Sequence, residues 1–245
     1  MSETRPTIVL VHGAFADASS WSGVIELLQR QGYTVVAPAN PLRGVKADSA
    51  YLASVVNQID GPALLVGHSY AGAVISDAAT DAPNVVGLVF VAAFAPDTDE
   101  RLGAVAATSK DSLLATAQVQ RRYPVGAGGE TAPEFLVDPA RFHEVFAADL
   151  PADRAAMMAA TQRPIAAAAF SDPCGPPAWR KLPSWAVVAT ADRAAGSDLV
   201  RSMAQRAGAD IVEVEGSHVI MVSQPQAVLR VIVTAAGAVA SPGDR

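Results

Sequence analysis

Residues 63–75, Ala63-Leu-Leu-Val-Gly-His-Ser-Tyr-Ala-Gly-Ala-Val-Ile75, join an apolar run to an alanine-rich segment through a glycine-flanked serine. This order predicts a buried strand, a sharp turn at Ser69 and a helix. A serine at such a turn has strained backbone geometry and presents its hydroxyl at the carboxyl edge of a sheet. The Gly-x-Ser-x-Gly pattern is met at Gly67, whereas Ala71 occupies the last glycine position and Gly72 follows it. The alternative is a serine that only caps the helix.

The composition excludes several classes of partner. Of 245 residues, 51% are hydrophobic, and the formal net charge is −6. No basic run exceeds Arg121-Arg122, which argues against nucleic acid. The longest apolar run, 85–95, is shorter than the roughly 20 residues of a membrane span, so no membrane insertion is expected. The N-terminus has no apolar signal core and the chain has a single cysteine, so we expect a cytoplasmic protein.

Strand and helix patterns alternate along most of the chain. Short apolar, β-branched runs predict buried strands at 7–11, 34–37, 63–66, 85–92, 184–190 and 210–214. Helix patterns lie between and after them, at 21–31, 48–59, 70–80, 197–207 and 225–238. This alternation predicts an α/β fold with a mostly parallel, doubly wound sheet and helices on both faces.

Residues 97–182 interrupt the alternation. They contain no run typical of a buried strand, and weak helical stretches at 113–122, 139–148 and 153–161 are separated by segments rich in glycine and proline. We therefore predict a core formed by residues 1–96 and 183–245, with a helical cap at 97–182 inserted above the sheet. The alternative is a separate small helical domain.

The best candidate for a general base is His218, which lies just after the last predicted strand and before the last helix. That position is at the same sheet edge as Ser69. The ordinary pKa of histidine, near 6.5, suits proton transfer at neutral pH. Without Ser69 nearby, a lone loop histidine would be read as a surface residue.

An acidic partner for this histidine is expected after the fifth predicted strand, at Asp192. Such an acid would hold the imidazole tautomer and stabilise the imidazolium. Asp198 is a competitor, as are Asp97 and Asp99 after the fourth strand. Asp192 is favoured because it lies nearest to the end of its strand.

The loop after the first strand, at 12–15, is the expected second half of an oxyanion hole. The residue after the nucleophile supplies one backbone N–H, here Tyr70, and this loop supplies the other. We assign it to Ala14, with Phe15 as the alternative. Gly13 lets the loop approach a substrate closely. The ring of His12 is expected to hydrogen-bond loop backbone.

Together, the motifs at 11–15, 67–72, 192 and 216–218 resemble the α/β-hydrolase superfamily. More closely, the chain is similar to small bacterial esterases related to plant methyl-ester esterases and hydroxynitrile lyases. The resemblance implies a catalytic triad of Ser69, Asp192 and His218, a helical cap, and no cofactor. The chain begins directly at the first predicted parallel strand, so we expect the N-terminal antiparallel hairpin of larger members to be absent.

Two positions separate esterases from lyases in that group. The lyases carry a threonine after the histidine of the first loop and a lysine after the catalytic histidine. This chain has Gly13 and Val219 there. A cyanide leaving group needs a nearby positive charge, so these residues favour ester hydrolysis. Cofactor-free lyase, perhydrolase or cyclase chemistry on the same triad is the alternative function, and a non-catalytic ligand binder is a third reading.

Large apolar side chains in residues 97–182 indicate the substrate class. Most of them are expected in the core of the cap; they are Phe135, Phe142, Phe146, Met157, Met158, Phe170 and Trp179. The predicted substrate-binding residues are Gly13, Phe15, Phe135, Phe146 and Trp179. The predicted partner is a small, largely apolar carboxylic ester cleaved through an acyl-enzyme intermediate. No metal is expected, because no Cys/His cluster has ligand spacing. A homodimer is one assembly open to the chain.

Overall fold

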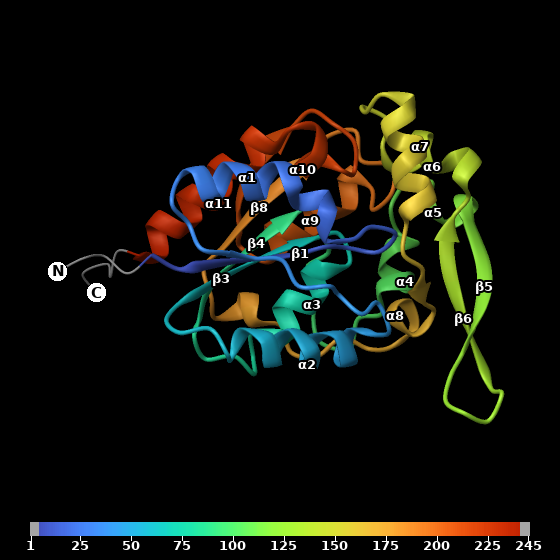
Figure 1. The fold of residues 1–245 in the computed structure, drawn as a ribbon, viewed down its shortest axis with the longest axis horizontal. Coiled ribbons are helices and arrows are strands. Elements are labelled where there is room, and N and C mark those ends of the chain that lie inside the picture. The colour runs from blue at the N-terminus through green and yellow to red at the C-terminus, as the bar shows by residue number, and fades with distance from the viewer. Residues whose placement is uncertain (1–4, 241–245) are drawn as a thin grey trace.

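The computed structural model describes residues 5–240. A six-stranded sheet with the order β2-β1-β3-β4-β8-β9 forms its centre, and each pairing in it is parallel (Figure 1). Its strands are β1 (Thr7–Val11), β2 (Val35–Val36), β3 (Ala63–His68), β4 (Val85–Val91), β8 (Ser184–Ala189) and β9 (Asp210–Val214). The predicted α/β class and strand positions are thereby confirmed.

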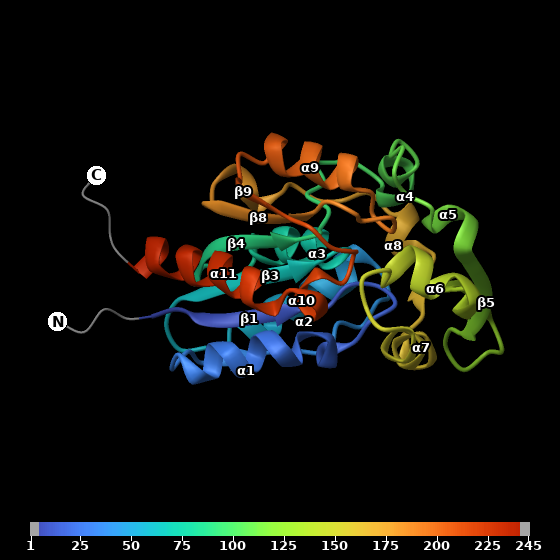
Figure 2. The ribbon, with the colours of Figure 1, turned by 90° about the horizontal axis from the view of Figure 1, so that it is seen from above.

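Helices cover both faces of the sheet (Figures 1 and 2). One face carries α1 (Ser22–Arg30), α10 (Ile220–Ser223) and α11 (Pro225–Ala240), and the other carries α2 (Val45–Val56) and α3 (Ala71–Ala78). Helix α9 (Ser197–Arg206) packs on β8. Every residue of β3 and β8 is buried, as expected for parallel strands covered on both sides. No helix within residues 5–240 is long and apolar enough to cross a membrane.

The chain between β4 and β8 forms a layer at the carboxyl end of the sheet, opposite the start of β1 and the end of α11 (Figures 1 and 2). Its helices are α4 (Leu102–Ala106), α5 (Leu114–Ala117), α6 (Pro139–Phe146), α7 (Ala152–Thr161) and α8 (Ala168–Ser171). The 3₁₀ turn η2 (Ala178–Arg180), just before β8, contacts α3 instead. A second, antiparallel sheet in the order β5-β6-β7 consists of β5 (Gln118–Pro124), β6 (Thr131–Val137) and β7 (Ile165–Ala166). The short 3₁₀ turn η1 (Ala18–Trp21) precedes α1.

The helix predicted over 113–122 is wrong. Only Leu114–Ala117 is helical, and the chain then extends as β5, which pairs with β6 along its whole length. Strand β5 is mostly exposed, so it lacks the apolar run that marks a buried strand. The glycine-rich segment after it closes a β-hairpin, with Val125 N–H donating to the Glu130 carbonyl at 2.9 Å. The insertion is therefore a mixture of helices and sheet.

Candidate active site

Ser69 sits on a sharp turn between β3 and α3. Its φ of 55° lies in the left-handed region, which a serine adopts only under strain. The surrounding backbone holds it there: Ser69 N–H donates to the Val91 carbonyl at 3.2 Å, and its carbonyl accepts from Gly72 N–H at 3.0 Å and Phe94 N–H at 3.1 Å. This conformation is the sharp, strained turn at Ser69 that the motif predicts.

Two glycines make the turn sterically feasible. A Cβ on Gly67 would lie 2.7 Å from the Ala71 carbonyl oxygen, and one on Gly72 would overlap the Phe94 carbonyl oxygen. Helix α3 thus crosses the loop after β4 at Gly72. Ala71, the departure from the sequence pattern, is buried without displacing Ser69 from its left-handed conformation. The close approach therefore depends on the glycine one position later.

His218 and Asp192 form a buried pair at the same edge of the sheet. His218 Nδ1 lies 2.8 Å from Asp192 Oδ2, with both side chains at most 1% exposed. The other carboxylate oxygen accepts from the backbone N–H groups of Ala194 at 2.8 Å and Ala195 at 3.0 Å. An ionised Asp192 can only accept, so the Nδ1 proton lies on His218 and Nε2 is left as the basic nitrogen.

The competing acids have other partners. Asp198 accepts from Ser109 Oγ at 2.5 Å and Lys110 N–H at 2.8 Å. The carboxylate of Asp97 lies 2.6 Å from Arg180 Nη2. Within residues 5–240, no hydrogen bond joins Asp97, Asp99 or Asp198 to His218.

Gly13 packs against Ser69, and His68 contacts His218, so these two residues lie between the serine and the histidine. A Cβ on Gly13 would lie 2.8 Å from Ser69 Cβ, so the first loop runs directly against the serine. His68 Nε2–H donates to the His218 carbonyl at 3.0 Å, and the two rings are 4.6 Å apart. In the described part of the chain no hydrogen bond joins Ser69 Oγ to His218; such bonds are often long in enzymes without bound substrate.

The first loop presents free backbone donors. Within residues 5–240, the backbone N–H groups of Ala14, Phe15 and Tyr70 have no acceptor. His12 holds the loop from behind: Nδ1–H donates to the Gly13 carbonyl at 2.9 Å, and Nε2 accepts from Asn40 N–H at 3.0 Å. Burial lowers the pKa of His12 to about 4, so the ring is neutral and serves as a support for the loop.

The alpha/beta hydrolase family matches residues 8–231. This chain belongs to that family. The alpha/beta hydrolase nvfD of Aspergillus novofumigatus is 27% identical over 95% of this chain and 97% of its own length. Among solved structures, polyneuridine aldehyde esterase is similar with a TM-score of 0.78 and 19% identity, covering 95% of this chain and 99% of that one. A pyrethroid hydrolase from Sphingobium faniae JZ-2 has a TM-score of 0.76 and 21% identity, covering 99% and 100%.

These findings confirm the resemblance predicted from the motifs. At such identities the solved structures show a shared fold, and the family matches nearly all of the chain, including the first loop, the serine turn, Asp192 and His218. The remaining predicted site residues of this hydrolase-family member are Phe15 of the first loop and Phe135, Phe146 and Trp179 of the insertion.

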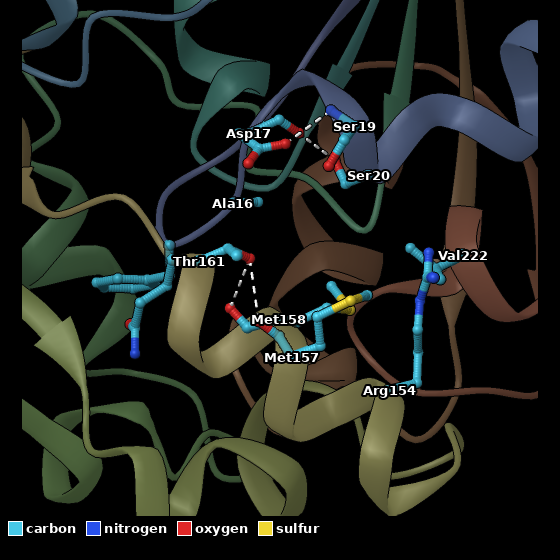
Figure 3. Close-up of a pocket in the computed structure, with 11 residues that line it drawn as sticks. Ala16, Asp17, Ser19, Ser20, Arg154, Met157, Met158, Thr161 and Val222 are labelled. Atoms are coloured by element: carbon cyan, nitrogen blue, oxygen red, sulfur yellow. Dashed lines mark hydrogen bonds between the residues drawn. The ribbon is translucent and has the colours of Figure 1, made fainter.

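Phe146 lies beside the His218 ring, and Phe15 packs against Phe146. The Phe146 ring is 4.8 Å from the imidazole and 6.1 Å from the Phe15 ring, and both phenylalanines are buried. Next to Phe15, a cavity of about 40 Å³ separates residues 16–20 from Met157 and Met158 of α7 (Figure 3). The insertion therefore contacts the first loop directly.

Phe135 and Trp179 lie elsewhere in the insertion. The Phe135 ring packs at 6.2 Å from Phe170 and lines a largely apolar cavity of about 330 Å³. Ser112, also in that lining, donates to the Ala194 carbonyl at 2.6 Å, which places the cavity beside the Asp192 loop. Trp179 Nε1–H donates to the Pro96 carbonyl at 3.0 Å, a contact that supports the chain where it leaves β4.

Two acidic residues at this edge were missed by sequence reasoning. Asp149 of the insertion accepts from Ser217 N–H at 2.9 Å and also from Ser217 Oγ, directly beside His218. Burial would raise the pKa of Asp149, but the hydrogen bonds from Ser217 outweigh it, so the pKa is lowered. Asp48 accepts from the Tyr70 hydroxyl at 2.8 Å. Neither lies in a motif, and each contacts a residue far away in sequence.

Proposed function

We propose that this protein is a serine hydrolase of carboxylic esters, with Ser69 as nucleophile, His218 as general base and Asp192 as its acidic partner. The observation that carries the proposal is the left-handed Ser69 at the end of β3, at the same sheet edge as the buried His218–Asp192 pair. Family membership supports a hydrolase. The esterases and pyrethroid hydrolases among the structural neighbours favour an ester as substrate.

In the first half of the reaction, Ser69 Oγ attacks the ester carbonyl carbon while its proton passes to His218 Nε2. The carbonyl π electrons move onto oxygen, and the N–H groups of Tyr70 and Ala14 (or Phe15) bind the oxyanion. The tetrahedral intermediate collapses, the bond to the alkoxy group breaks, and His218 returns the proton to the leaving alcohol. The acyl group stays on Ser69.

In the second half, water attacks the acyl carbonyl carbon and gives a proton to His218. Collapse of the second intermediate breaks the bond to Ser69 Oγ, which takes the proton back, and the acid leaves. Asp192 orients the imidazole and stabilises the imidazolium in both halves. Its second oxygen is held by the Ala194 and Ala195 N–H groups, so the carboxylate cannot rotate freely.

The substrate we propose is a small, largely apolar ester bound between the core and residues 97–182, which act as a cap. The Phe146 ring beside His218 and the Phe15 ring packed on Phe146 support this choice, as does the cavity lined by Phe135 near the Asp192 loop. No cofactor enters these steps. The single cysteine, Cys174, is a buried free thiol, which fits action in the cytoplasm.

Labelling by a fluorophosphonate, which reacts with activated serines, tests the proposal. Wild type and the control Ser54→Ala, on the exposed side of α2, should both label and hydrolyse p-nitrophenyl esters. Ser69→Ala should do neither. Unlabelled wild type, or equal labelling of wild type and Ser69→Ala, would refute Ser69 as the nucleophile.

A further inference from the structure

Asp48 is a carboxylate with no exposed surface, on helix α2 and outside the triad. Its Oδ2 accepts from the Tyr70 hydroxyl at 2.8 Å, and its two oxygens accept from Arg43 N–H at 3.0 and 3.2 Å. All these partners are donors, which matches an ionised carboxylate. Helices α2 and α3 pack side by side, so the contact spans two neighbouring elements (Figure 1).

A buried carboxylate is a costly residue for stability alone. Burial raises the pKa of Asp48, which measures the penalty on its charged form. A well-packed apolar side chain of similar size often stabilises a fold as well as a buried charge does. The position of this charge, with its hydrogen bonds to one tyrosine and one loop, therefore points to a role in geometry.

Tyr70 is the residue on which that geometry acts. It directly follows Ser69, its ring is 1% exposed, and its unpaired backbone N–H is the proposed oxyanion donor. Burial and the nearby Asp48 charge raise the pKa of the Tyr70 hydroxyl well above its ordinary value, so the hydroxyl keeps its proton and donates. The side chain is thus tethered at its far end, which restricts rotation of the residue that carries the N–H.

The other partner of Asp48 belongs to the loop on which the insertion docks. The Leu42 carbonyl accepts from Ala166 N–H of β7 at 2.9 Å, and Arg43 Nη1 lies 3.1 Å from Glu134 of β6. Leu42 is buried with a φ of 61°, a strained conformation that the neighbouring bonds must maintain. Asp48 therefore joins the docking loop of the insertion to the residue after the nucleophile.

We propose that Asp48 is a positioning residue for ester hydrolysis: through the Tyr70 hydroxyl it fixes the backbone N–H of Tyr70 toward the oxyanion. This inference rests on the proposed function. Small displacements of an oxyanion donor weaken transition-state binding more than substrate binding, so the effect belongs in kcat and not in KM.

The test compares Tyr70→Phe with Tyr51→Phe, a matched control on the exposed face of α2 where the tyrosine is 43% exposed. In Tyr70→Phe, kcat for a p-nitrophenyl ester should fall about 10-fold with KM nearly unchanged. The affinity for a phenylboronic acid, which forms a tetrahedral adduct on the serine, should fall by the same factor. Tyr51→Phe should match wild type in both measurements.

Asp48→Asn keeps the size of the side chain but removes the charge, and it should show the same split between kcat and KM. If both Tyr70→Phe and Asp48→Asn keep wild-type kcat and boronate affinity, or if both fail to fold, Asp48 has no positioning role. If one variant fails to fold, the other decides by the same criterion. Wild type that neither labels with a fluorophosphonate nor hydrolyses esters would refute the proposed function itself, an outcome distinct from either of these.

Discussion

The carboxyl edge of the parallel sheet and the insertion above it are held by different kinds of contact. At the edge, Ser69, Asp192 and His218 are buried and fixed by backbone hydrogen bonds and the strands behind them. The insertion meets that edge through the Phe146 ring and through polar contacts between side chains, among them Asp149 with Ser217 and the half-exposed Arg43 with Glu134. In the function proposed above, the buried edge would carry out bond-breaking and the insertion would select substrates.

The largest expected effect is a difference in kcat between variants of two acidic residues, one that pairs with His218 at the edge and one that holds the insertion. Asp192→Asn removes the charge that stabilises the imidazolium and disturbs the His218 tautomer, so kcat should fall about 10⁴-fold. Asp198→Asn is the matched control, because Asp198 only holds Ser109 and Lys110 of the insertion. Its kcat should stay near the wild-type value. Equal losses in a p-nitrophenyl ester assay would show that the two acids are not distinguished as proposed.

The free energy of unfolding should depend on pH through His12, which supports the first loop at this edge. Its folded-state pKa of about 4 is below the unfolded value of 6.5, so the unfolded chain binds more protons between these values. The stabilisation from neutral His12 is fully present above about pH 6.5. It is lost as the pH drops toward 4, and the total loss in the free energy of unfolding is about 3 kcal/mol.

Urea unfolding of wild type and His12→Gln at several pH values isolates this contribution. Wild type should lose more stability than His12→Gln as the pH falls from 7 to 4.5. Parallel stability curves for the two proteins would contradict the account of His12 as a neutral support.

The polar attachment of the insertion should have a moderate effect. Asp149→Ala removes hydrogen bonds from a carboxylate to Ser217, and we expect the free energy of unfolding to fall by about 1–2 kcal/mol. Asp153→Asn, at an exposed position in the first turn of α7, is the control and should cost less, about 0.5 kcal/mol, through the helix dipole alone. Thermal and urea unfolding measure both. A neutral Asp149→Ala would mean that the apolar contacts alone dock this segment.

The smallest expected effect is a change in the preference for the length of the acyl chain. Phe135→Ala enlarges the cavity near the Asp192 loop, which we propose receives the acyl chain, so the ratio of kcat/KM for p-nitrophenyl hexanoate over acetate should rise about 10-fold. Trp179→Phe removes the hydrogen bond to Pro96 and part of a ring that does not line the Phe135 cavity, so it should leave the ratio unchanged. An unchanged ratio in Phe135→Ala would place substrate selection elsewhere in the insertion.

The two regions also differ in what their sequences predict. The core strands are apolar runs buried on both faces, so their positions follow from hydropathy, and their carboxyl ends bring Ser69, Asp192 and His218 to one edge. Strand β5 has no such signal because it is exposed and rich in Gln and Arg. The contacts of Asp48 and Asp149 depend on tertiary packing between segments 22 and 68 residues apart, which no local pattern encodes.

Mass spectrometry of the acid-quenched enzyme during its first turnover of a p-nitrophenyl ester tests the central claim most directly. We predict a burst of one p-nitrophenolate per active site, and an acyl group mapped to Ser69 in the peptide that spans β3 and α3. A burst-free reaction with no acyl adduct, or an adduct on another residue, would contradict the account.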